Sequence, residues 1–173
     1  CDAKVNFTDT YFDGCEGTYT ILRTWSVLSD CLPVGSNNPV TKVQRIEVED
    51  KAGPQFACPG DVTVSVDPFG CCATAALPDM IVSEGCSSIK TLEAKVTGTD
   101  PATGNVITFT VKGQLGDFAG NNYWHPDTLA IFPYTQCLPM GVYTVRYTAE
   151  DGCGNTSSCE FQMTVADLVP PVS

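Results

Sequence analysis

The chain has 173 residues, of which 20 are acidic and 9 basic, and its net charge at neutral pH is −11. This acidity disfavours a nucleic-acid partner, because phosphate binding depends on clusters of lysine and arginine. No apolar run approaches the roughly 18 residues of a membrane-spanning helix, so we expect no direct membrane insertion. The length suffices for one large domain or two small ones.

Residues 1–54 predict three strands, at about 3–8, 18–28 and 40–49, because apolar and polar side chains alternate there. A complete immunoglobulin-like sandwich has about seven strands, so this first module is short or incomplete. One face of its second strand carries Tyr19, Ile21 and Trp25, and we predict that these residues form an interface. Arg23 falls on the same face, so we expect its stem to snorkel or to lie near a sheet edge.

Residues 55–173 predict a second module with the same alternation, for example at 61–66 and 159–165. The stretch 87–134 is expected to be an inserted hairpin and a long loop. Strands at 92–96 and 106–111 form the hairpin, and residues 116–133 form the loop. Its aromatic residues favour contacts over disorder, and the predicted interface residues there are Phe118, Tyr123 and Trp124. The fold class is therefore all-β, with tandem immunoglobulin-like β-sandwich modules stapled by disulfides.

Ten cysteines in a chain of this length favour an oxidising compartment, where disulfides persist. A zinc site would need closely paired ligands, but the sequence has no C-x2-C motif and its one histidine is His125. We predict a secreted or cell-surface protein in which every cysteine is oxidised. The ten are Cys1, Cys15, Cys31, Cys58, Cys71, Cys72, Cys86, Cys137, Cys153 and Cys159. The cysteine at residue 1 and the linker-like residues 169–173 predict a piece of a longer protein.

An internal repeat relates the two modules. Residues 17–24 parallel residues 141–148, and both stretches precede an acidic turn, a cysteine and a second alternating strand. The repeat places a module boundary near Pro54. Three cysteines lie before this boundary and seven after it, so full oxidation requires a bridge that crosses the boundary or leaves the chain.

Residues 58–64, Cys86 and residues 141–156, followed by the alternating strand up to 171, resemble a hyalin repeat. The resemblance covers 58–171, although 87–134 is much longer than the usual repeat. It implies an immunoglobulin-like sandwich of extracellular and bacterial surface proteins, usually in tandem and associated with adhesion, and it implies no catalytic residues. Residues 1–54 more loosely resemble the C-terminal half of related repeats in large bacterial surface adhesins and fibre proteins.

Acidic residues suggest calcium sites, and short sequence patterns suggest glycosylation sites. Carboxylate oxygens in loops are suitable ligands for calcium, although no EF-hand pattern occurs. The alternative interpretation is that these acidic residues only form a solvated surface. No cofactor is expected to be required. The candidate calcium ligands are Asp9, Asp13, Glu16, Glu49, Asp50 and Asp167. Asn6 and Asn155 lie in N-glycosylation sequons, and Thr128 lies in an acidic-threonine-aliphatic pattern of bacterial O-glycosylation, for which a chance match is the alternative.

An enzyme is not expected, because no serine or cysteine is arranged with the single imidazole as in a nucleophilic site. We expect an extracellular structural or adhesive unit of a tandem array. Its partners would be neighbouring copies of itself, joined head-to-tail into a cell-surface fibre or filament. The alternative is a surface module that binds a glycan or a host or cell-surface protein through residues 116–133.

Overall fold

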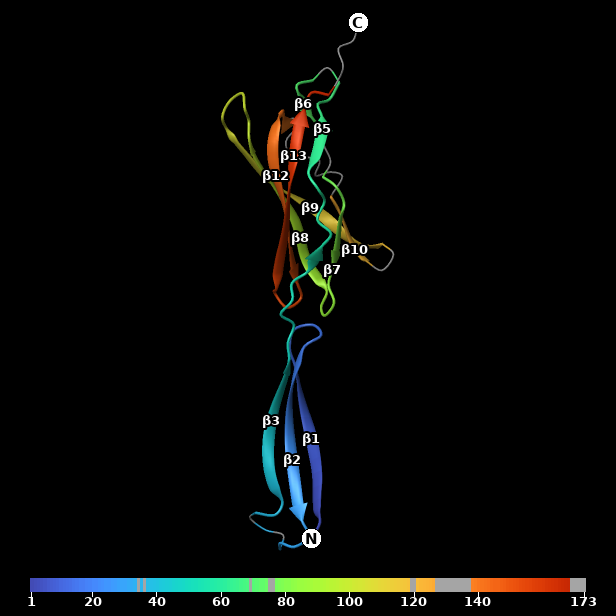
Figure 1. Cartoon of the computed structure of the whole chain (residues 1–173), viewed down its shortest axis with the longest axis vertical. Coiled ribbons are helices and arrows are strands. Elements are labelled where there is room, and N and C mark those ends of the chain that lie inside the picture. Colours follow the sequence, from blue (N-terminus) through green and yellow to red (C-terminus); the bar gives the residue numbers. More distant parts are fainter. Residues whose placement is uncertain are drawn as a thin grey trace. The chain divides into compact units, whose positions relative to one another are not determined.

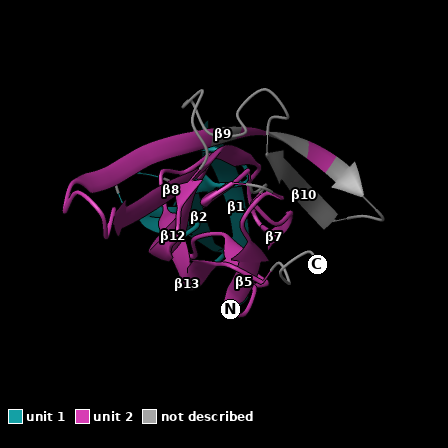
Figure 2. Ribbon diagram, turned by 90° about the horizontal axis from the view of Figure 1, so that it is seen from above, with its two compact units in different colours: residues 1–51 teal, residues 52–173 magenta. Residues whose placement is uncertain are grey.

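A computed structural model describes residues 1–33, 35, 37–68, 70–74, 77–118, 121–126 and 138–168. The described secondary structure is all β (Figure 1), and the predicted all-β immunoglobulin-like fold class is confirmed. The chain separates into two compact units, Cys1–Lys51 and Ala52–Ser173 (Figure 2), close to the boundary predicted at Pro54. Among the described residues, no helix is long and apolar enough to span a membrane.

Unit 1 is a three-stranded antiparallel sheet of β1 (Ala3–Asp13), β2 (Tyr19–Ser29) and β3 (Val40–Val48), in the order β1-β2-β3. Strands occur where the alternation predicts them, and β1 continues further because Tyr11 and Phe12, both good strand formers, pair with β2. Gly17 has a φ of 78° in the connecting turn, a left-handed conformation that glycine adopts without steric cost.

One end of the unit 1 sheet is fastened by a disulfide and a buried amide. Cys1 and Cys31 are bonded, with Cα atoms 5.6 Å apart. Asn38 is only 3% exposed, and its side chain accepts from the Ser29 amide and donates to the carbonyls of Ser29 and Leu32, at 2.7–2.9 Å. No hydrophobic side chain is buried in the described part of unit 1, so these polar and covalent contacts take the place of a core.

Unit 2 contains an eight-stranded sheet in the order β4-β7-β10-β9-β8-β12-β13-β5 and a two-stranded sheet, β11-β6. Its strands are β4 (Gln55–Phe56), β5 (Val62–Ser65), β6 (Cys72–Ala73), β7 (Met80–Ser83), β8 (Ile89–Thr99), β9 (Val106–Phe118), β10 (Asn121–Pro126), β11 (Leu138–Pro139), β12 (Gly141–Asp151) and β13 (Thr156–Ala166). The described strand pairs are antiparallel except for β5 on β13. The hairpin predicted at 92–96 and 106–111 is confirmed as β8 and β9.

The loop predicted at 116–133 is wrong at its start. Strand β9 continues to Phe118, and β10 returns beside it, paired with both β9 and β7. Glycine and asparagine are poor strand formers by propensity, but pairing on both sides overrides a local preference of this kind. Residues 127–133 lie outside the described part.

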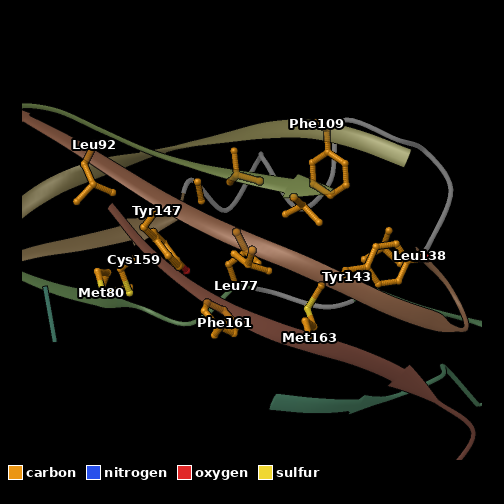
Figure 3. Packing of buried hydrophobic residues seen from close by; sticks show 14 of the residues in the cluster. Leu77, Met80, Leu92, Phe109, Leu138, Tyr143, Tyr147, Cys159, Phe161 and Met163 are labelled. Carbon is orange, nitrogen blue, oxygen red and sulfur yellow. The ribbon is translucent and has the colours of Figure 1, made fainter. Parts of the chain in front are cut away.

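The core of unit 2 gathers side chains from the strands β8, β9, β12 and β13, from the segment 66–82 and from Leu138 (Figure 3). Tyr143, Val145 and Tyr147 on β12 are fully buried. The Tyr147 hydroxyl donates to the Pro78 carbonyl, and the Tyr143 hydroxyl donates to the Pro139 carbonyl four residues upstream, both at 2.9 Å. The second contact has the form of a tyrosine corner. Burial raises the pKa of both hydroxyls, so both remain protonated donors.

The cysteines do not all behave as predicted. Cys58 and Cys159 are bonded, with Cα atoms 5.8 Å apart, and Cys15, Cys72 and Cys153 are also disulfide-bonded. Cys71 and Cys86 are free and exposed, so the prediction that all ten cysteines are oxidised is wrong for these two. Cys71 lies just before strand β6, which begins at Cys72. Cys137 lies outside the described residues.

Candidate functional site: the apolar face of unit 1

One face of the unit 1 sheet is largely apolar. Successive side chains on a strand point to opposite faces, and the register aligns Phe7 with Trp25, and Tyr11 with Ile21 and Ile46. We call the following residues the apolar face: Val5, Phe7, Tyr11, Tyr19, Ile21, Trp25, Val27, Val40, Ile46 and Val48. The opposite face carries mostly threonine and charged side chains, interrupted by a few apolar residues such as Phe12 and Val43.

The apolar face is open to solvent. Tyr11 is 62% exposed, Val5 58%, Val40 52% and Phe7 51%. Of the residues predicted to form the interface, Tyr19 is 39% exposed, while Ile21 and Trp25 are only partly buried. A contiguous exposed apolar surface on a soluble protein typically marks an interaction site.

An ion pair occupies the centre of this face. The Arg23 guanidinium donates through Nε and Nη2 to the two carboxylate oxygens of Asp9, both at 2.8 Å. The hydrogen bonds and charge of Arg23 lower the pKa of Asp9, so the carboxylate remains ionised. The guanidinium carbon also lies 4.1 Å from the centre of the Phe7 ring and 5.4 Å from that of Trp25. A partner could therefore cover the face without leaving an unpaired charge at its centre.

This pair corrects two expectations. Asp9 lies in strand β1 rather than in the predicted loop, and its carboxylate is paired with Arg23. Arg23 lies in the central strand β2, so of its two predicted alternatives only the sheet edge is ruled out. The pattern of a single strand could not reveal that Asp9 and Arg23 are opposite each other, because only the register of β1 on β2 brings them together.

Ring contacts hold the apolar face in a fixed form. The Phe7 and Trp25 rings lie 5.3 Å apart with planes tilted by 55°, and the Trp25 indole donates to the Gln44 side chain at 2.9 Å. The Tyr11 and Tyr19 rings lie 6.3 Å apart. Cross-strand aromatic pairs of this kind stabilise a sheet, so these contacts support the arrangement of the face within a single chain.

Most of the other predicted calcium ligands do not gather into a site. Glu49 forms an ion pair with Lys51 at 2.6 Å, which lowers its pKa, and Asp13 and Asp167 are exposed. In the described ranges, no group of three ligand atoms within 4.8 Å of one another includes Asp9, Asp13, Glu16, Glu49 or Asp167. Asp50 lies two residues after β3, near the end of unit 1. Within unit 2, carboxylate oxygens of Glu84 and Asp151 lie within 4.8 Å of each other, a pair that sequence analysis did not single out.

Asp151 organises the turn between β12 and β13. Its fully buried carboxylate accepts from the backbone amides of Cys153 and Asn155, both at 2.8 Å, and from the Asn155 side chain at 2.9 Å. Burial alone would raise the pKa of Asp151, but these hydrogen bonds outweigh it and lower the pKa. The Asn155 amide nitrogen, which a glycan would need, is therefore engaged in the folded chain. Asn6 lies exposed on β1, and Thr128 is outside the described residues.

The aromatic residues of the second predicted interface lie on strands. Phe118 ends β9, and Tyr123 and Trp124 belong to β10, where their backbones pair with both β9 and β7. These positions are therefore part of the eight-stranded sheet rather than of a free loop.

Comparison with known families adds one finding. No curated protein sequence matches the chain. Residues 130–165 match the family model of the HYR domain, and this stretch contains all of β12 and most of β13. Unit 2 thus contains a hyalin-repeat-like module, a kind of repeat domain that occurs in extracellular and cell-surface proteins, and the disulfides agree with that location.

Proposed function

We propose that this protein is an extracellular structural or adhesive unit that joins neighbouring copies head-to-tail into a cell-surface fibre. The observation that carries the proposal is the contrast between the units. Unit 2 has a full hydrophobic core, whereas the described part of unit 1 buries no hydrophobic side chain and exposes its apolar face. A three-stranded sheet normally needs a second layer to bury one face.

The energetics favour a tethered contact. Seven residues of the apolar face are at least 36% exposed, and completing their burial contributes about 5–10 kcal/mol, if each side chain is worth roughly 1.5–3 kcal/mol on full burial. Association of free partners costs roughly 4–15 kcal/mol in lost freedom. Face burial alone would therefore give weak binding between separate molecules. Linking copies of this chain in a tandem array raises the effective concentration of each copy near its neighbour, which makes the same contact strong.

The open edges of the unit 1 sheet favour the same assembly. Strands β1 and β3 are both edges of the three-stranded sheet, and unpaired strand edges recruit further strands. A contact between this face or edge and a different surface of the next copy is heterologous. Heterologous contacts that do not close into a ring produce filaments.

Sedimentation of the oxidised chain over a dilution series tests the proposal. Replacing Trp124 with phenylalanine leaves Trp25 as the single tryptophan, so its emission reports on the apolar face. We expect solvent-exposed emission in dilute monomer and a blue shift as the chain associates. A compact dilute monomer in which Trp25 is already shielded from water would contradict the proposal.

The alternative function is a module that binds a glycan or protein through residues 116–133. Glycan-array or pull-down binding that is lost in Trp124→Ala, in a chain that does not self-associate, would favour this alternative.

Calcium is a separate proposal for the acidic residues. It is tested by adding calcium and then a chelator while the melting temperature is followed, and an unchanged melting temperature would reject it.

A further inference from the structure

The two units share one three-stranded arrangement. The repeated stretches 17–24 and 141–148 lead into or lie in the central strands β2 and β12. Tyr19 on β2 pairs with Asp13 and Val48 on its two neighbours, and Tyr143 on β12 pairs with Gly98 and Met163. Strands β1, β2 and β3 of unit 1 therefore correspond to β8, β12 and β13 of unit 2.

Corresponding positions differ in exposure rather than in pattern. Tyr143 and Val145 are fully buried, but Tyr19, in the place of Tyr143, is 39% exposed, and Ile21 is only partly buried. Because the residues on the strand are similar, the difference lies in what covers them.

In unit 2, side chains from residues 54–83, together with Leu138, are buried against this face. This segment contributes Val66, Leu77, Met80 and Val82, each at most 5% exposed. The segment also supplies an edge strand, because β5 pairs in parallel with β13 from Val62 to Ser65.

Two further contacts fasten this segment to the sheet it covers. The Cys58–Cys159 disulfide joins its beginning to β13. The Tyr147 hydroxyl donates to the Pro78 carbonyl near its end. In the described part of unit 1, β3 has no strand on its outer edge and no layer lies over the apolar face.

We propose that a neighbouring module donates to unit 1 an extended segment with the pattern of residues 54–83. Its first part pairs in parallel with the outer edge of β3, with an apolar side chain at every second position, as in Val62, Val64 and Val66. Its second part lies over the apolar face. This inference rests on the proposed function and names what the neighbour contributes, in the manner of strand addition to an exposed sheet edge.

The donated segment should differ from residues 54–83 opposite the polar side chains of this face, where Lys42 and Gln44 lie beside the Arg23–Asp9 pair. Arg23 and Asp9 stand where unit 2 has Tyr147 and Ala94, so the partner meets a paired charge in the middle of the face. A polar group opposite Arg23 would satisfy the guanidinium donors that Asp9 leaves free, whereas an all-apolar cover would desolvate them. A second unit 1 packed face to face would cover the apolar residues but leave the β3 edge unpaired, so the donated segment accounts for more of the structure.

The experiment fuses a second copy of residues 54–88 in front of Cys1 of the full chain. In unit 2, residues 84–88 connect this segment to β8, the counterpart of β1, so the same connection suits the fusion. Serine replaces the cysteines of the added copy, and Trp124→Phe leaves Trp25 as the reporter. The matched control carries threonine in place of the three valines of the added copy, at the positions of Val62, Val64 and Val66.

We expect the fusion to shift Trp25 emission to the blue and to slow amide exchange along β3 by at least about tenfold, with neither effect in the control. A synthetic peptide of residues 58–83, with serine for cysteine, provides the same test in trans if the fusion misfolds. Unchanged emission and exchange with both donors, or equal protection by the control, would overturn the inference.

Two other outcomes separate this inference from the proposed function. The unfused chain could self-associate and bury Trp25 without any donor. That result would make a second unit 1 the partner, and it would refute the donated-segment inference but not assembly itself. A dilute unfused monomer that already shields Trp25 would refute assembly itself.

Discussion

Phe7 and Phe12 offer a matched test of the apolar face. Both lie on β1 and both are 51% exposed, but the register places them on opposite faces of the sheet. Covering the remaining half of Phe7 is worth about 0.8–1.5 kcal/mol, half the value for complete burial. Phe7→Ser should therefore weaken assembly by about four- to twelvefold, and Phe12→Ser should leave it unchanged.

Sedimentation equilibrium on both variants measures this difference, and urea unfolding of dilute monomer provides the correction for stability. Phe7 also contacts the Trp25 ring and the Arg23 guanidinium, so its removal should destabilise the monomer somewhat more than removal of Phe12. Equal loss of assembly in the two variants would refute the assignment of the interface to one face. No loss in either would refute the role of the sheet faces altogether.

Three further results are expected. In Gly98→Ala the new Cβ would clash with the buried ring of Tyr143, so urea unfolding should show a free energy of unfolding lower by about 1–3 kcal/mol. Gly141→Ala meets only ordinary contacts and should lower the free energy of unfolding much less. Equal losses in the two variants would contradict the packing argument. The lowered pKa of Asp151 means that its contribution to stability is present above the unfolded pKa of about 3.9 and is lost as pH falls through the folded pKa. Asp151→Asn should therefore have a lower melting temperature at neutral pH, and its melting temperature should depend less steeply on pH in acid. An unchanged dependence of the melting temperature on acid pH would count against this role. Alkylation of the native, unreduced chain should label Cys71 and Cys86, and mass spectrometry that finds both protected would contradict their assignment as free thiols.

Local pattern accounts for most of the strands. Alternation within 18–28 and 40–49 predicted β2 and β3, because the two-residue period of a strand is written in consecutive residues. The same reasoning failed for 116–126, where glycines and asparagines predicted a loop. There the pairing of β10 with β9 and β7 decided the structure, and partners that are distant in sequence leave no local signal.

The candidate site was predictable only in part. Tyr19, Ile21 and Trp25 share a face because of their spacing alone, so the sequence sufficed to group them. The pairing of Arg23 with Asp9 was not predictable, since it depends on the strand register. The same is true of the approach of Glu84, which follows β7, to Asp151, which ends β12.

By itself, the sequence determined which residues form strands and which side chains share a face, because both follow from the geometry of consecutive residues. Whether a face is covered was decided only by the tertiary structure. Tyr19 and Tyr143 occupy the same place in the repeated motif, yet one is 39% exposed and the other fully buried. Tyr143 is buried in a core that includes side chains from residues 54–83, which are distant along the chain and are joined to β13 by a disulfide and by strand pairing.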